Sequence, residues 1–531
     1  MTTDISAVSG STPGLSGIFE SRSFRLLFPI GLFCIPLGTA LFHDIHRSYL
    51  TSVDADIVFI YEALRLNAGL PQTYLSHTGY VLFMLLAWWL RLMEVLGLVP
   101  LSSLNDLLPI NKGTFEADYE LLVFAGRYMI AILSGGFAIA FYWGVRAVIG
   151  SGIVAVIGGL IFAASKELCL QALMLFTELP SGLFLLLSVI LLIIVGRSDH
   201  PLRLAFFAAM FATISMMSKM QVVFPVLFLP VIALVFNLPV GQTTLRKQTI
   251  HQIDGLDLVL RVLLALAFSV LAIHMVGTSA VLGGNGGLYQ LVFAGYVAAA
   301  IYVLGRAWNI PWRHQVLMMV TVLSGVSAGL YLHFVYHTPE AVDALVNFVE
   351  TMFVLGSVSQ DVGGTADNLP WVSIILVPLE SLYNVIVRRF WDMNLFDHPV
   401  DILNWAILVS IIALSAIGEK IQAIRVSTFL VMAICVEGAF GLYKVSDKHL
   451  IYIDTWLMFA AILSATYLLP RLTGALKGGM LVLAGVIFVA EINALTNPDW
   501  VDHKRGNISC GQTRDYTPLI ADGFKHYCTK K

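Results

Sequence analysis

Residues 24–79 read FRLLFPIGLFCIPLGTALFHDIHRSYLTSVDADIVFIYEALRLNAGLPQTYLSHTG, an apolar run followed directly by a polar loop. The run at 24–43 has the length that an α-helix needs to cross a bilayer. It is too long for a signal-peptide core and lacks a small-residue cleavage site, so we interpret it as an uncleaved anchor. Arg22 and Arg25 are expected to hold its start in the cytoplasm. The loop at 44–79 places ionisable groups beside a bilayer, where they are costly, and is therefore the first candidate for a functional site.

The composition of the whole chain indicates a membrane protein. Of its 531 residues, 58% are hydrophobic and only 12% are charged, whereas soluble domains carry roughly 25% charged residues. The formal net charge is −3, which argues against a nucleic-acid partner because such proteins need a basic face. Membrane lipids are the expected surroundings.

Apolar stretches of about 17–25 residues mark the expected membrane spans. They predict an all-α polytopic bundle of about thirteen helices at 24–43, 122–146, 150–166, 180–196, 203–218, 221–238, 257–277, 289–305, 314–336, 402–418, 426–443, 450–469 and 478–496. Short basic loops, which are typical of the cytoplasmic side, alternate with acidic or longer ones. The basic loops carry Arg146, Arg197, Arg203, Arg246, Lys247, Arg306, Arg313, Lys420, Arg425, Arg471 and Lys477.

The stretch from Tyr80 to Val99 is long enough to span a membrane, but it contains Arg91 and Glu94. Counting it as a span would place every later basic loop outside, so we interpret it as an amphipathic helix along the outer surface. The same interpretation applies to 371–391. The expected organisation is a disordered cytoplasmic N-terminus (1–23), a transmembrane domain (24–496) with outer loops at 44–121 and 337–401, and an outer tail (497–531). Whether Cys510 and Cys528 of this tail form a disulfide stays open.

Six polar residues stand out for their chemistry. Asp54 and Asp56 form a D-x-D pair that can bind a divalent cation or act as a base, although Asp also caps helices. Glu178 opens a span at the outer side, where a carboxylate also suits the helix dipole. Lys219 lies between two spans, where a compact cation suits a phosphate but also snorkels to the interface. Glu437 and Glu491 lie inside late spans and must face a partner or a cavity.

The order of these features resembles the GT-C superfamily of membrane glycosyltransferases, in the branch of protein O-mannosyltransferases and the lipid A aminoarabinose transferase. The stretch SVDADIVFIYEALRLNAGLP is similar to the family's first-loop signature, and Asp54 matches its acid. SHTGYVLFMLLAWWLRLMEVLG is similar to the following His-Pro-Pro stretch, but Thr78 and Gly79 replace both prolines, so that His77 corresponds only weakly.

Later stretches continue the resemblance in the same order. ELLVFAGRYMIAILSGG resembles the span with an outer Arg, here Arg127, and FTELPSGLFLLL resembles the element with an acid opening a span, here Glu178. MFATISMMSKMQVVFPVLFL is similar to the element with a Lys at an outer turn, here Lys219. KVSDKHLIYIDTW is similar to the basic entry of a late span, with Lys448 and His449.

The resemblance implies transfer of a sugar from a polyprenyl-phosphate-linked donor to an acceptor lipid, polysaccharide or protein at the outer face. Asp54 is the expected base of an inverting displacement and Asp56 a metal ligand or hydrogen-bond partner, although which of the two takes the proton stays open. Glu178 completes the catalytic set. The expected substrate-binding residues are His77, Arg127, Lys219, Lys448 and His449. Asp56 and Glu178 are the expected ligands of a divalent cation, Mg or Mn. The expected location is a bacterial plasma membrane, with the active site and C-terminus outside. The alternatives are a transporter or flippase of a lipid-linked saccharide and a polysaccharide polymerase or ligase.

Overall fold

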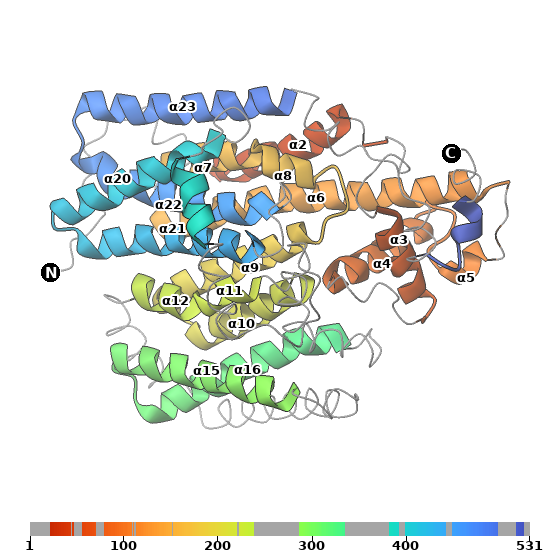
Figure 1. The fold of residues 1–531 in the computed structure, drawn as a ribbon, viewed down its shortest axis with the longest axis horizontal. Helices are drawn as coiled ribbons and strands as arrows, with labels where there is room; N and C mark the ends of the chain where they lie inside the picture. Colours follow the sequence, from red (N-terminus) through yellow and green to blue (C-terminus); the bar gives the residue numbers. More distant parts are fainter. Residues whose placement is uncertain are drawn as a thin grey trace.

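The computed structural model describes residues 22–43, 45–46, 56–70, 79–108, 110, 113–150, 152–219, 222–237, 286–334, 382–391, 399–441, 449–496 and 517–524. These residues form helices, turns and connections, and no β-strand occurs among them. Within them, nine helices are long and apolar enough to cross a membrane. The protein is therefore a polytopic helical membrane protein, as its composition and its long apolar stretches predict (Figure 1).

The nine membrane-length helices coincide with predicted spans. They lie in α2 (Arg22–Phe42), α6 (Phe115–Ile149), α9 (Glu178–Ile194), α10 (Pro201–Ser218), α16 (Trp312–Phe334), α20 (Ile402–Ala416), α21 (Lys420–Gly441), α22 (Leu450–Leu468) and α23 (Gly474–Thr496). A further predicted span, 289–305, is helical within α15 (Gly286–Ala307). The span predicted at 257–277 lies outside the described residues.

Two predicted spans differ from the structure. The first, 150–166, contains the short helix α7 (Gly152–Ala163), because Ser165 starts a separate helix, α8 (Lys166–Gln171), by capping it. The second, 221–238, is divided into α11 (Val223–Leu227) and α12 (Leu229–Asn237). Prolines disfavour an unbroken helix, and this stretch contains Pro225 and Pro230.

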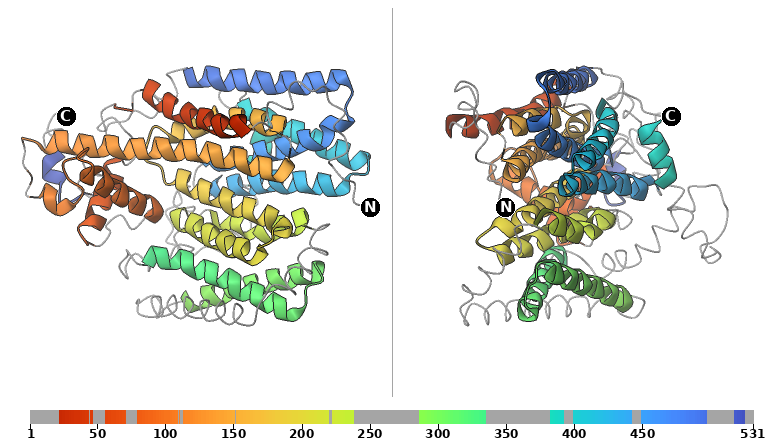
Figure 2. Two further views of the ribbon diagram at one scale, coloured as in Figure 1. Left: turned by 180° about the vertical axis from the view of Figure 1, so that it is seen from behind. Right: turned by 90° about the vertical axis from the view of Figure 1, so that its left-hand side faces the viewer.

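Helix α6 is much longer than the hydrocarbon core of a membrane is thick. Its 35 residues extend roughly 50 Å at about 1.5 Å per residue, well beyond a hydrocarbon core of about 30 Å. Glu116 and Asp118 in its first turn and Arg146 in its last complement the helix dipole, and Gly150 ends it in a left-handed conformation. Its N-terminal part projects beyond the other long helices (Figures 1 and 2).

The projecting part of α6 supports a layer of shorter helices at one end of the bundle. This layer contains α3 (Asp56–Asn67), α4 (Tyr80–Val95) and α5 (Leu104–Leu107) (Figure 1). In α4, Arg91 donates a hydrogen bond to the Asn67 carbonyl oxygen and Glu94 accepts one from Ser102. The two charges of this helix therefore hold neighbouring loops in place. Its position along the membrane surface stays a prediction.

Close helix pairs in the bundle depend on glycine. Gly325 and Gly329 of α16 face the backbone of α10, and a Cβ at Gly329 would lie only 3.0 Å from the Met210 carbonyl oxygen. Small residues four apart are typical of membrane helices whose backbones approach each other closely. The hairpin of α15 and α16 is thereby fastened to α10.

Candidate active site

The connection between α7 and α9 organises the candidate site. Every residue from Phe162 to Gly182 is buried, although connecting segments ordinarily lie on the surface because their backbone groups need partners. Two distant carboxylates provide such partners here. Glu491 of α23 accepts a hydrogen bond from the Lys166 amide at 2.9 Å, and Asp56 of α3 accepts one from the Leu175 amide at 3.0 Å. We name residues 162–182 the buried connection.

Asp56 also forms a buried ion pair with Arg127 of α6. One oxygen, Oδ2, accepts from Arg127 Nε at 3.0 Å and from Nη2 at 2.8 Å, and both side chains are 0% exposed. Arg127 Nη1 in turn donates to the Ile45 carbonyl oxygen at 3.0 Å. Because both oxygens of Asp56 are engaged, this residue fits the hydrogen-bonding role that the sequence allows it better than the role of base. Asp56 thereby joins α3 to α6 and to the buried connection.

A second charged cluster forms where α9 begins. The Glu178 carboxylate lies 2.8 Å from Lys219 Nζ and 3.4 Å from His449 Nε2, and it accepts a hydrogen bond from Thr177 at 3.2 Å. Glu178, Lys219 and His449 are at most 7% exposed. The structure thus brings together three residues that the sequence predicts for the site, from segments far apart in the chain.

Two serines fix α9 and α10 relative to each other next to this cluster, and neither was predicted from the sequence. Ser181 Oγ donates to the Ser215 carbonyl oxygen at 2.9 Å, and Ser215 Oγ donates to the Ser181 carbonyl oxygen at 2.7 Å. The reciprocal bonds join α9 to α10 about one turn from Glu178 and Lys219. A pair of small hydroxyl residues inside two apolar spans was the available signal.

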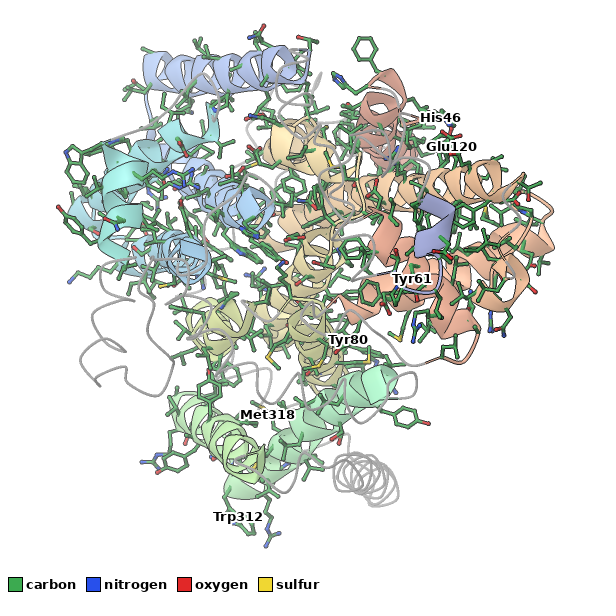
Figure 3. The ribbon with its side chains drawn as sticks, turned by 45° about the vertical axis from the view of Figure 1, so that its right-hand side comes forward. His46, Tyr61, Tyr80, Glu120, Trp312 and Met318 are labelled. Carbon is green, nitrogen blue, oxygen red and sulfur yellow. The ribbon has the colours of Figure 1, made fainter. Side chains whose placement is uncertain are left out.

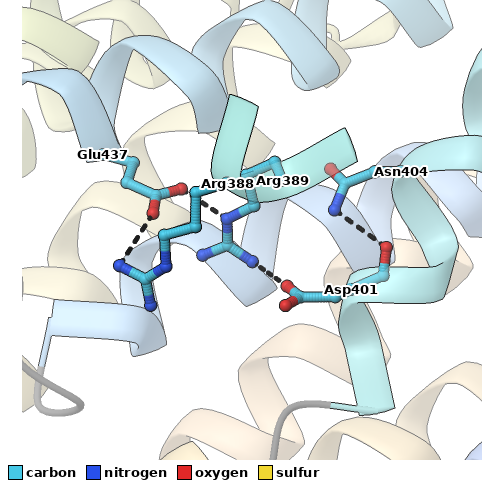
Figure 4. Close-up of polar contacts among 5 residues, drawn as sticks. All are labelled: Arg388, Arg389, Asp401, Asn404 and Glu437. Atoms are coloured by element: carbon cyan, nitrogen blue, oxygen red, sulfur yellow. Dashed lines mark hydrogen bonds and ion pairs between the residues drawn. The ribbon is translucent and has the colours of Figure 1, made fainter. Parts of the chain in front are cut away.

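A third charged cluster surrounds Arg389, in the helical stretch 382–390 (Figure 4). Arg389 pairs with Glu437 of α21 and with Asp401, which ends the turn η7 (Pro399–Asp401) before α20. The neighbouring Arg388 reaches Glu437 at 3.5 Å, and Asn404 donates to the Asp401 carbonyl oxygen at 2.9 Å.

The arginines of this cluster explain how the carboxylate of Glu437 can be buried within a predicted span. Burial alone would lower the pKa of Arg389, but the carboxylates of Glu437 and Asp401 raise it above its usual value, so that the guanidinium stays charged. A polysaccharide polymerase or ligase is expected to have its key basic residues in a large later outer loop, and in the predicted loop at 337–401 Arg388 and Arg389 are the basic pair. Their charges are largely neutralised within the protein.

Several predicted site residues lie outside the described part of the chain: Asp54, His77 and Lys448. Within the part that is described, no group of three or more His, Cys, Asp or Glu side chains is arranged to bind a metal ion. Asp56 is saturated by Arg127 and Leu175, and Glu178 is paired with Lys219. Both carboxylates are thus engaged by cationic side chains in this structure, and an Mg or Mn site at Asp56 and Glu178 stays a prediction.

Comparison with known proteins gives little more than a distant similarity. No protein-family model matches the chain. No curated protein matches it either. Among solved structures, the crystal structure of the Archaeoglobus fulgidus oligosaccharyltransferase, a complex with Zn and sulfate, is similar with a TM-score of 0.43 and 12% sequence identity. The similarity covers 95% of this chain and 57% of that one, so this chain spans little more than half the length of the archaeal enzyme.

Proposed function

We propose that the protein is a membrane glycosyltransferase that uses a polyprenyl-phosphate-linked sugar. The observation that carries this proposal is the joining of the pair Asp56–Arg127 to the cluster Glu178–Lys219–His449 through the buried connection. Buried charges are costly, and in membrane proteins they mark substrate sites by default. Here two sets of them attach to the buried connection three residues apart, at Leu175 and at Glu178.

Asp54 is the base in this proposal. It precedes Asp56 by two residues, so the chain keeps their Cα atoms within about 7 Å of each other. Both oxygens of Asp56 are engaged by Arg127 and by the Leu175 amide, so the proposal assigns proton transfer to Asp54. Asp54 removes the proton from an acceptor hydroxyl as its oxygen forms a bond to the anomeric carbon of the donor. The bond from that carbon to the phosphate oxygen breaks, the lipid phosphate leaves with the electron pair, and the configuration inverts.

Lys219 and His449 stabilise the departing phosphate. Negative charge builds up on the leaving oxygen, and a fixed cation in a water-poor site lowers the barrier more than it would in water. Glu178 holds both side chains at one place and balances the charge of Lys219 until the donor binds. No step in this proposal passes through a metal ion.

The test is an in vitro transfer assay with the purified protein, a polyprenyl-phosphate sugar and an extract of candidate acceptors. We expect Asp54→Asn to abolish transfer while donor binding persists, because only the proton acceptor is lost. Asp106→Asn, an exposed change in the same layer of helices, is the matched control and should transfer at the normal rate. Normal transfer by the Asp54→Asn variant would contradict the proposal.

The same variant separates this function from the transporter or flippase. Movement of a lipid-linked saccharide across the bilayer needs no proton acceptor at Asp54. A flippase should therefore retain its activity in the Asp54→Asn variant when flipping is measured in vesicles with a fluorescent lipid-linked sugar.

A further inference from the structure

The turn between α15 and α16 has a rigid geometry. The Ile310 amide donates to the Gly305 carbonyl oxygen at 2.8 Å and the Asn309 amide donates to the Arg306 carbonyl oxygen at 3.2 Å. Asn309 has a positive φ of 53°, and Pro311 lies two residues further along the chain. This is the Schellman arrangement, which ends a helix sharply. Gln315 Nε2 also donates to the Ile310 carbonyl oxygen at 2.7 Å, which joins the turn to α16.

This turn carries two positive charges that no residue in the described part of the chain pairs with. Arg306 and Arg313 flank it, both are exposed, and neither forms an ion pair with any residue that the structure describes. The sequence from Leu258 to Pro339 contains no Asp or Glu. By contrast, Arg471, which follows α22, is neutralised by Glu419. The hairpin tip is thus a local source of positive potential.

Aromatic side chains surround the same turn. Trp312 is 69% exposed and Tyr302 is 60% exposed, and the Arg313 guanidinium lies 5.8 Å from the centre of the Trp312 ring. Figure 3 shows Trp312 at the far tip of the hairpin, turned away from the bundle. Trp and Tyr at the end of a membrane span are typical of the level of the lipid headgroups.

A hollow lies between these side chains. It has a volume of ≈ 590 Å³ and is lined by Tyr302, Arg306, Asn309, Trp312 and Gln315. Binding sites for small ligands fall in the range of about 300–1,000 Å³. The lining combines a guanidinium and amide groups with exposed aromatic rings, which suits an anion attached to an apolar body.

We propose that the turn between α15 and α16 is a binding site for the headgroup of an anionic phospholipid. Arg306, which lines the hollow, binds the phosphate, and Arg313, next to the Trp312 ring, adds positive charge beside it. Asn309 and Gln315 offer hydrogen bonds to the remaining headgroup, and Trp312 and Tyr302 rest at the boundary with the acyl chains. The site is distinct from the candidate active site. Gly325 and Gly329 pack along α10 so that Trp312 lies at the end away from Lys219. The proposal does not depend on glycosyl transfer.

Native mass spectrometry of the full-length protein tests it, with phosphatidylglycerol and phosphatidylcholine of identical acyl chains as probes. We expect preferential retention of phosphatidylglycerol. The double variant R306Q/R313Q should bind it more than tenfold more weakly, because each arginine near an anionic headgroup contributes about fivefold. R306K/R313K, which keeps both charges, should retain most of the affinity.

The matched control is R471Q, which removes a basic residue that Glu419 already neutralises. It should bind phosphatidylglycerol like the unmodified protein. Three results would overturn the proposal: unchanged binding by R306Q/R313Q, an equal loss in R471Q, or equal retention of phosphatidylcholine. Displacement of the lipid by millimolar inorganic phosphate would assign the site to free phosphate instead and would also overturn it.

Discussion

At the scale of single residues, the central feature is a network of buried charges whose members have different roles. Asp56 and Arg127 neutralise each other with no exposure to solvent. Removing one member of such a pair leaves an uncompensated buried charge, which costs about 3–5 kcal/mol, whereas replacing both with apolar residues is far less damaging. The pair is therefore predicted to matter for stability as well as for the site.

Asp56→Asn should lower the thermal unfolding midpoint strongly, because Arg127 loses its counter-charge in the interior. The double variant Asp56→Leu with Arg127→Met should recover much of the loss. Arg471→Gln is the comparison, since the exposed pair with Glu419 is worth at most about 1 kcal/mol. Thermal unfolding in detergent, followed by tryptophan fluorescence, measures all three, and equal shifts in the two single variants would refute the assignment.

Lys219 is predicted to act on the reaction itself. Lys219→Met should reduce turnover by about 10²–10³-fold, the usual effect of losing one group that stabilises developing negative charge. Lys219→Arg should retain part of the activity because it keeps the charge. Steady-state kinetics of transfer checks this, and a change in KM at constant kcat would show that Lys219 only helps donor binding.

At the scale of elements, the buried connection between α7 and α9 is the least ordinary part of the fold. Its position predicts the behaviour of Cys169 in α8. Burial raises the pKa of this thiol to about 12, and a thiol stays protonated and unreactive below its pKa. A protein with Cys169 as its single cysteine should resist maleimide at pH 8 and react fully after denaturation. Rapid labelling of the folded protein would show that the connection is open.

The helices were predictable from the sequence, but this connection was not. Apolar runs of sufficient length identify spans through the cost of exposing a polar backbone to lipid. The connection is itself apolar, so that its first residues look like the end of a span at 150–166. The connection differs from the end of a span because its Lys166 amide donates a hydrogen bond to Glu491. That residue lies 325 residues away in the chain. No local pattern contains that information.

The candidate site, like the fold, was only partly predictable from the sequence. Glu178 and Lys219 were predicted from their places at span ends and His449 from the family resemblance, and the structure groups them. The pairing of Arg389 with Asp401 and Glu437 was not predictable, because sequence shows that an intramembrane charge needs a partner but not which partner it has. The roles of Asp54, His77 and Lys448 stay predictions.

At the scale of the whole molecule, the layer of α3, α4 and α5 and the basic turns are expected on opposite sides of the membrane. Asp106 of α5 and Lys420 at the start of α21 are both exposed and report the two ends. With other cysteines removed, Asp106→Cys should react with an impermeant maleimide in intact cells, whereas Lys420→Cys should react only after permeabilisation. The reverse result would invert the predicted orientation.

The central claim is transfer of a sugar from a polyprenyl phosphate to an outer-face acceptor. Mass spectrometry of lipid-linked sugars and envelope glycans tests it most directly, in cells that contain the protein, lack it, or carry Asp54→Asn. We predict that deletion and Asp54→Asn both remove one sugar from a glycan, lipid or protein while its polyprenyl carrier accumulates at the outer face. Unchanged glycans, with the carrier trapped on the inner face in the deletion alone, would contradict the account.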